Sequence, residues 1–352
     1  MKIFIQIVIS FFLAWWPIVV LTSVMMFGAP GSTNDAKNLK LVILVIFYPA
    51  AIGLALYLFK FVLWGIPPKW TLLATIVAPI VAVMAFGYPQ MLMNANAGIP
   101  NNRYFNNNSQ VFFRGKRIKA DPVTFQTIKE KTPDPSYPLN DIYAVDQNQV
   151  FINGKPIPNA DPKSFQIIGS DWRYTKDANH IYFEGKSIQG IDHNKFGKVQ
   201  PVVENDQSYT DGVSLVYWGA IVGKIDASSI RSMGPSYVKD RNQVFYLGRK
   251  ISNADPESFE VLNGGPFSRD KFRVYYSTDT VPGAHPETFQ VLERSYSKDA
   301  QNVYYLENGN QVKIIDNADP VSFKVTPYDS IRKSDAYDGK NYFINGKLVE
   351  KK

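Results

Sequence analysis

The chain has 352 residues, a formal charge of +7 and no cysteine. The lack of cysteine excludes disulfides, thiolate metal sites and cysteine nucleophiles. The basic excess is too dilute to indicate nucleic-acid binding, which uses basic residues clustered on one face. The long apolar runs lie before residue 94, and the remainder has the composition of a polar domain.

Three apolar stretches predict three transmembrane helices, at residues 3–27, 41–66 and 71–93. Each is long enough to cross a hydrocarbon core of about 30 Å at about 1.5 Å per residue. A cleaved signal peptide is the competing interpretation of the first stretch, but a signal core usually has only about 7–15 residues. The short connections predict a compact antiparallel bundle that makes up a transmembrane domain at residues 1–94.

The orientation of this bundle depends on few charges. Lys2, Lys60 and Lys69 fall on one side, and Lys37 and Lys40 fall on the other. Basic residues that open a long translocated domain count for less. We therefore expect the N-terminus inside and the large C-terminal domain outside.

The segment at residues 94–108, NANAGIPNNRYFNNN, is rich in asparagine. Its composition predicts a flexible linker between the helices and the rest of the chain. A proline-rich loop is expected at residues 131–138.

Residues 237–262 contain a short unit whose residue types indicate its local structure. A polar DRNQ turn precedes the strand-forming VFY, and Gly248 allows a tight reversal into a second strand. Asp255 suits a helix N-cap and Pro256 suits the first helical position. We expect one helical turn there, with Phe259 folding back as an anchor before the next strand.

The same unit recurs along the chain. The first core position of each copy falls at residues 111, 150, 181, 215, 244, 274, 303 and 342, at steps of 29 to 39 residues. A period of this size is typical of a repeat architecture. We predict a mainly-β domain at residues 95–352, built from about eight hairpin-plus-turn units of three short strands. Stacked units would make it solenoid-like or propeller-like.

The stretches DRNQVFY, DKFRVYY and DAQNVYY, each followed by a segment such as ADPESF, resemble the DKNYY family of bacterial repeat proteins. The resemblance covers roughly residues 100–349. The copy at 211–230 departs from the pattern, because it lacks both the proline and the aromatic anchor. The resemblance implies a β-rich module, often membrane-anchored or secreted, with no established activity. With the three predicted spans, we expect a multi-pass protein of the bacterial cytoplasmic (inner) membrane.

The residues that could carry chemistry have simpler explanations. The Asp-x-Asn turns at Asp146, Asp177 and Asp240 lack the 6–8 oxygen ligands of a calcium loop. Three histidines without cysteine argue against zinc. The chain has no nucleophile elbow, P-loop or dinucleotide fingerprint. We expect no enzyme activity, no cofactor and no metal.

Aromatic residues at the middle position of the core strands could form a ladder. Packing between repeats is the default interpretation, and an exposed ladder would be the main binding candidate. The irregular segment 197–225 adds a tryptophan, and departures from a repeat often lie on the binding face. The candidate surface consists of Phe112, Phe151, Tyr182, Trp218, Phe245, Tyr275, Tyr304 and Phe343.

These features predict a membrane-anchored, non-enzymatic module that binds a protein or an envelope component, with no nucleic-acid partner. One alternative is an immunity protein that neutralises a toxin at the membrane. Another is a glycan-acting envelope enzyme, which needs two carboxylates about 5–9.5 Å apart, with Asp206 and Asp211 as candidates. A third is a structural role in which the helices assemble with other membrane proteins.

Overall fold

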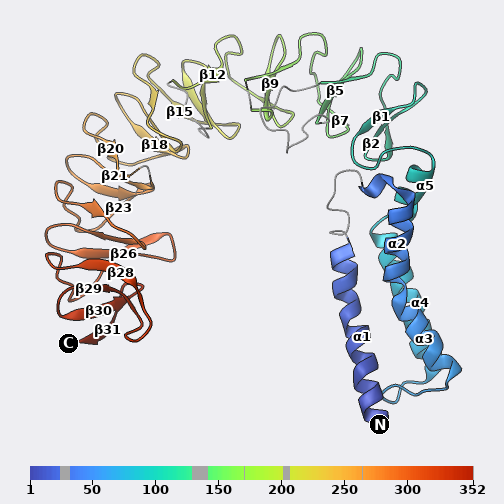
Figure 1. Ribbon diagram of the computed structural model, residues 1–352. Coiled ribbons are helices and arrows are strands. Elements are labelled where there is room, and N and C mark those ends of the chain that lie inside the picture. The colour runs from blue at the N-terminus through green and yellow to red at the C-terminus, as the bar shows by residue number, and fades with distance from the viewer. Residues whose placement is uncertain (24–31, 129–141, 170, 201–206, 264, 352) are drawn as a thin grey trace. The chain divides into compact units, whose positions relative to one another are not determined.

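The computed structural model describes residues 1–23, 32–128, 142–169, 171–200, 207–263 and 265–351 (Figure 1). The chain divides into two compact units, residues 1–172 and 173–352, and each is described by itself. The first unit contains the helices and the first repeats. The division therefore falls inside the repeat region, and the expected boundary between residues 94 and 95 stays a prediction.

The N-terminal region is helical, and two of its helices are long and apolar enough to cross a membrane. These two are α1 and α4, and the bent pair α2–α3 adds a third crossing if it is one span. The elements are α1 (Lys2–Ser23), η2 (Ser32–Asn34), α2 (Ala36–Ile46), α3 (Tyr48–Leu58), α4 (Pro68–Ala85) and α5 (Tyr88–Asn96).

The predicted span limits need correction. The stretch 41–66 is two helices that meet at a bend of 40° and end at Leu58. The stretch 71–93 begins at Pro68 and divides at Gly87, whose φ of 70° is left-handed. Residues 24–27 of the first stretch lie outside the described residues.

The bend between α2 and α3 has a local cause. Pro49 has no N–H, and Ala50 N donates to Phe47 O at 3.0 Å rather than to Ile46 O one residue earlier. The indole N–H of Trp16 in α1 donates to Ile46 O instead, at 2.8 Å. A carbonyl without its helical donor, as Ile46 O is at this bend, must find such a partner on a neighbouring helix when it lies inside a membrane.

The asparagine-rich segment is not a flexible linker, so that prediction is wrong. Asn94 donates to Asn101 Oδ1 at 2.8 Å and to Gly115 O in the first repeat at 3.1 Å. Asn101 donates to Thr33 O at 2.8 Å and to Met91 O at 3.0 Å. Side-chain amides carry both donors and acceptors, so they bind the first repeat to η2 and α5.

The first unit also contains two antiparallel sheets, with strand orders β1-β2-β3 and β4-β5-β6-β7. Its strands are β1 (Tyr104–Asn106), β2 (Val111–Phe113), β3 (Lys116–Ile118), β4 (Gln126–Thr127), β5 (Tyr143–Val145), β6 (Val150–Ile152), β7 (Lys155–Pro156) and β8 (Gln166–Ile167).

The second unit continues the same pattern, and β9 to β11 pair as successive antiparallel strands. These three are β9 (Tyr174–Lys176), β10 (Ile181–Phe183) and β11 (Lys186–Ile188). Five sheets with four strands each follow in chain order. Their strands are β12 (Gly197–Lys198), β13 (Ser208–Thr210), β14 (Ser214–Tyr217), β15 (Ala220–Lys224), β16 (Arg231–Ser232), β17 (Tyr237–Lys239), β18 (Val244–Tyr246), β19 (Arg249–Lys250), β20 (Glu260–Val261), β21 (Phe267–Arg269), β22 (Val274–Tyr276), β23 (Asp279–Thr280), β24 (Gln290–Val291), β25 (Tyr296–Lys298), β26 (Val303–Glu307), β27 (Gln311–Ile314), β28 (Lys324–Asp329), β29 (Ser334–Tyr337), β30 (Asn341–Ile344) and β31 (Lys347–Lys351).

The eight predicted core positions each lie in a strand of a different sheet, so the count of repeats is confirmed. A complete unit has four strands rather than the predicted three. The additional strand precedes the turn aspartate, as β17 precedes Asp240, and the predicted strand after the anchor phenylalanine is present as β20 after Phe259. None of the sheets formed by the described residues closes into a barrel.

Candidate functional site at the repeat junctions

One buried aspartate precedes the core strand of each repeat after the first. In Asp299, Oδ1 accepts hydrogen bonds from the backbone N–H groups of Gln301 and Asn302, both at 2.7 Å. This is the self-capping turn that aspartate favours. The equivalent residues are all buried: Asp146, Asp177, Asp211, Asp240, Asp270 and Asp338.

The second oxygen of this carboxylate contacts the preceding repeat. Oδ2 of Asp299 accepts from the backbone N–H of His285 at 2.8 Å. His285 stands where other copies have the aspartate of Ala-Asp-Pro, and the bond needs only its backbone. The same bond links Asp121 to Asp146, Asp192 to Asp211, Asp226 to Asp240, Asp255 to Asp270 and Asp319 to Asp338.

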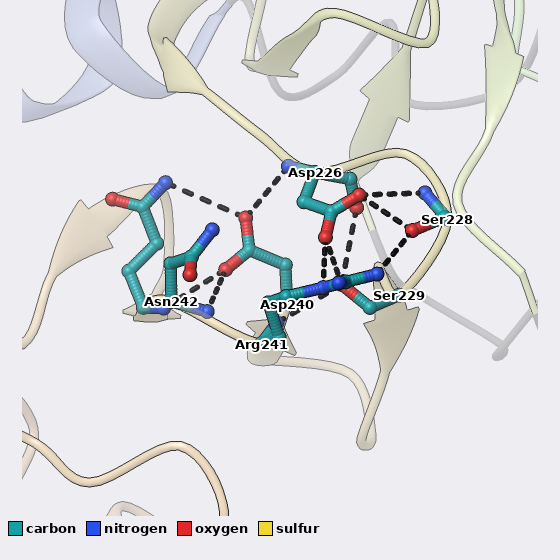
Figure 2. A network of polar contacts seen from close by, with 7 residues as sticks. Asp226, Ser228, Ser229, Asp240, Arg241 and Asn242 are labelled. Carbon is teal, nitrogen blue, oxygen red and sulfur yellow. Dashed lines mark hydrogen bonds and ion pairs between the residues drawn. The ribbon is translucent and has the colours of Figure 1, made fainter.

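Figure 2 shows this junction at the degenerate copy, where the motif has lost its proline and phenylalanine. Asp226 N still donates to Asp240 Oδ2 at 2.9 Å, and Ser229 Oγ accepts from Arg241 N at 3.0 Å (Figure 2). Arg241 also forms an ion pair with Asp226. A hydrogen bond from Ser228 is the main reason why the pKa of Asp226 is lowered. The junction therefore survives the loss of both signature residues.

The hydrogen bonds of the junction favour the charged form of Asp299. Burial by itself raises the pKa of Asp299, but the hydrogen bonds from His285, Tyr304 and the turn outweigh it and leave the pKa lowered. Burial, and the bond from its hydroxyl to Asp299 at 2.7 Å, raise the pKa of Tyr304. The proton stays on the tyrosine, so this pair holds the repeat together rather than exchanging protons.

The sequence analysis missed a contact within the repeat, between the strand before the turn aspartate and the motif that follows the hairpin. A basic side chain directly before the turn aspartate donates to the carbonyl of the motif proline in the same way in three repeats. Lys298 Nζ donates to Pro320 O at 2.9 Å, and the other two pairs are Lys239 with Pro256 and Arg269 with Pro286. Burial, followed by the charge of Arg231, lowers the pKa of Lys239. The sequence signal that could have predicted this contact is a basic residue directly before the turn aspartate, which recurs in these three repeats.

The aromatic ladder, which would be the main binding candidate if it were exposed, is buried. Seven of the eight candidates, all except Trp218, are at most 9% exposed. In four of them the ring packs on the anchor phenylalanine of the preceding motif, as Phe259 does on Tyr275 at 6.1 Å and Phe289 on Tyr304 at 5.7 Å between centroids. The default interpretation, packing between repeats, is confirmed by ring contacts for Phe151, Tyr275, Tyr304 and Phe343 and by its cluster with Leu215 for Phe245, while Phe112 and Tyr182 are buried.

Trp218 is the exception among the candidates, because half of it is exposed. It occupies the first turn position of the β14–β15 hairpin with a φ of 49°, and Gly219 follows with a φ of 73°. The guanidinium of Arg173 lies 4.2 Å from the centroid of its ring, and Phe183 meets it edge-on at 6.2 Å. We call Trp218, Arg173 and Phe183 the Trp218 cluster.

The carboxylate pair of the glycan-enzyme alternative has no support. Asp206 lies outside the described residues, and Asp211 is a turn residue whose Oδ1 accepts from Val213 N and Ser214 N. Burial by itself raises the pKa of Asp211, but these backbone donors outweigh it and the pKa is lowered. Within the described part of the chain, no three His, Asp or Glu residues gather as a metal site would require.

Comparison with known proteins gives one match. The model of the DKNYY family matches residues 143–279, which span the third, fourth and fifth repeats and most of the second and sixth. No curated protein and no solved structure matches. The motifs and the match agree: residues 143–279 match the model of the DKNYY family.

Proposed function

We propose that this protein is a membrane-anchored, non-enzymatic module whose repeats bind a protein partner through the Trp218 cluster. The observation that carries the proposal is the exposed ring of Trp218 and its contact with Arg173. The same hairpin turn position has a positive φ in every repeat and holds Arg114, Asn153, Glu184, Leu247, Ser277, Asn308 and Asn345 in the others. Trp218 is therefore distinguished by its large, half-exposed aromatic side chain rather than by its backbone.

The composition of the cluster favours a protein over a glycan. Tryptophan and arginine are the residue types that dominate interface hot spots. Arg173 covers one face of the Trp218 ring, so only the other face is open for stacking on a sugar. The neighbouring hairpin adds Leu247, which is 41% exposed. An immunity protein is the version of this function in which the partner is a toxin.

The anchor and the array support the same function. Helices α1 and α4 are apolar enough to hold the chain in a membrane. Within each unit the junctions connect neighbouring repeats, an arrangement that suits a solenoid-like array with an extended surface. No cofactor enters this proposal, because the cluster acts by contact alone.

A photo-crosslinking residue placed at position 218 of the full chain, in native membranes, is expected to capture one discrete partner. The matched control is position 272, because Phe272 is also exposed and also beside a cation, Lys271 Nζ at 5.0 Å from the ring centroid. Trp218→Ala is expected to lower co-purification of that partner by about 30-fold, and Phe272→Ala is not. Equal capture at both positions, or a partner indifferent to Trp218→Ala, would refute the proposal.

We also propose that the repeats lie outside a bacterial cytoplasmic membrane and the N-terminus inside. Protease added to the outer face of sealed cells should then digest the repeats and leave a fragment that contains α1 to α4. Protected repeats would reverse this orientation. In that event the basic residues at 103–119 would have set the topology by the positive-inside rule.

A further inference from the structure

The hairpin of the first repeat carries an exposed cationic end. Arg103, Arg114 and Lys116 are all exposed, and they meet around the turn at Gly115. Arg114 N donates to Arg103 O at 3.0 Å, and Lys116 pairs with Phe113 across the hairpin. The guanidinium of Arg114 lies 5.2 Å from the centroid of the Phe113 ring. We call these three basic residues the basic tip.

The basic tip is held close to the end of the membrane helices. Gly115 O accepts from Asn94 in α5, and Tyr88 at the start of α5 hydrogen-bonds Ser23 at the end of α1 at 2.8 Å. Asn94 lies six residues after Tyr88, so the two are within about 9 Å along the helix axis. This distance is comparable to a lipid headgroup layer, which adds about 5–8 Å to each side of the hydrocarbon core.

The charge around the tip is almost entirely positive. Asp35 is the only acidic residue in the first 120, and its carboxylate caps the start of α2 by accepting from Lys37 N. Lys37 and Lys40 are exposed in the first turns of α2, beside the η2 segment that Asn101 contacts. Among the described residues, no carboxylate forms an ion pair with the basic tip.

We infer that the basic tip binds the phosphate groups of anionic phospholipids and seats the first repeat on the membrane surface. Each guanidinium can donate two parallel hydrogen bonds to a phosphate, and the lysine contributes a compact point charge. The hydrogen bonds of Asn94 hold the basic tip in position before any lipid binds, so binding does not require a flexible segment to become ordered. The recognised chemistry is a phosphate diester in a lipid headgroup.

Native mass spectrometry of the full chain in detergent tests this inference with phosphatidylglycerol and phosphatidylcholine. We expect the wild type to retain phosphatidylglycerol preferentially. Arg114→Gln with Lys116→Gln should lower that retention by about 25-fold, because each basic residue near an anionic surface contributes about fivefold. Retention of phosphatidylcholine should not change.

The matched control is Arg249→Gln with Lys250→Gln. These exposed residues form the corresponding second hairpin strand of the fifth repeat, so the net charge changes equally while the basic tip stays intact. An equal loss in both variants would show a net-charge effect and overturn the inference. Unchanged retention in the Arg114/Lys116 variant would also overturn it. Neither outcome bears on partner capture at Trp218.

Discussion

Asp299→Asn is expected to lower the free energy of unfolding of the repeat region by about 2–4 kcal/mol. The asparagine oxygen can still accept from Gln301 N and Asn302 N, but its amide cannot accept from His285 N. A buried N–H is then left without an acceptor, and the charge that Tyr304 contacts is lost. One substitution therefore weakens the turn within its repeat and the junction to the repeat before it.

Asp279→Asn is the control, because this aspartate is exposed at the edge of its sheet and should change stability by less than about 0.5 kcal/mol. Hydrogen exchange of the full chain in detergent gives the local readout. Amides at residues 281–305 should exchange faster in Asp299→Asn than in the control. Exchange confined to the turn itself, with the preceding motif unaffected, would contradict the role of Asp299 as a junction.

The repeats could be predicted from the sequence because each contact of the junction depends on residues at fixed spacing. Asp270 lies at the same spacing before Val274 as Asp299 does before Val303. Each of these residue types has a backbone preference that fits its position in the turn or strand. The strand after Phe259 was predicted, but the strand before the turn, β17, was missed because three residues carry little periodic signal. Its pairing with β18 becomes visible only when the sheet is assembled.

The candidate surface could not be settled from sequence for a different reason. A strand with apolar residues on both faces is buried only if neighbours cover both faces. The sequence around Tyr275 does not show whether the ring of Phe259 packs on it. Trp218 was included for its irregular segment, but its exposure and its contact with Arg173, 45 residues earlier, are not reported by any residue pattern. The asparagine contacts of Asn94 and Asn101 were also hidden, because polar composition indicates a linker as readily as a hydrogen-bonded junction.

Gly248→Ala should destabilise the repeat region by about 3 kcal/mol, from two separate sources. Gly248 has a φ of 74°, which strains any residue with a Cβ. A Cβ there would also lie 2.7 Å from the side chain of Tyr217 in the preceding repeat. That distance is well inside normal contact, so the ring or the hairpin must move.

Gly309→Ala separates these two sources. Gly309 has nearly the same φ, 71°, in the equivalent hairpin turn, and a Cβ there would meet nothing within 4 Å. It should therefore carry only the backbone strain of about 1–2 kcal/mol. Pulse proteolysis of the full chain across a urea series measures both variants. A larger loss of unfolding free energy in Gly248→Ala than in Gly309→Ala would measure the packing of one hairpin on the next, because the backbone strain is common to both variants. Equal losses would mean that Tyr217 moves away at no cost, and that the buried carboxylate contacts, rather than hairpin packing, hold adjacent repeats together.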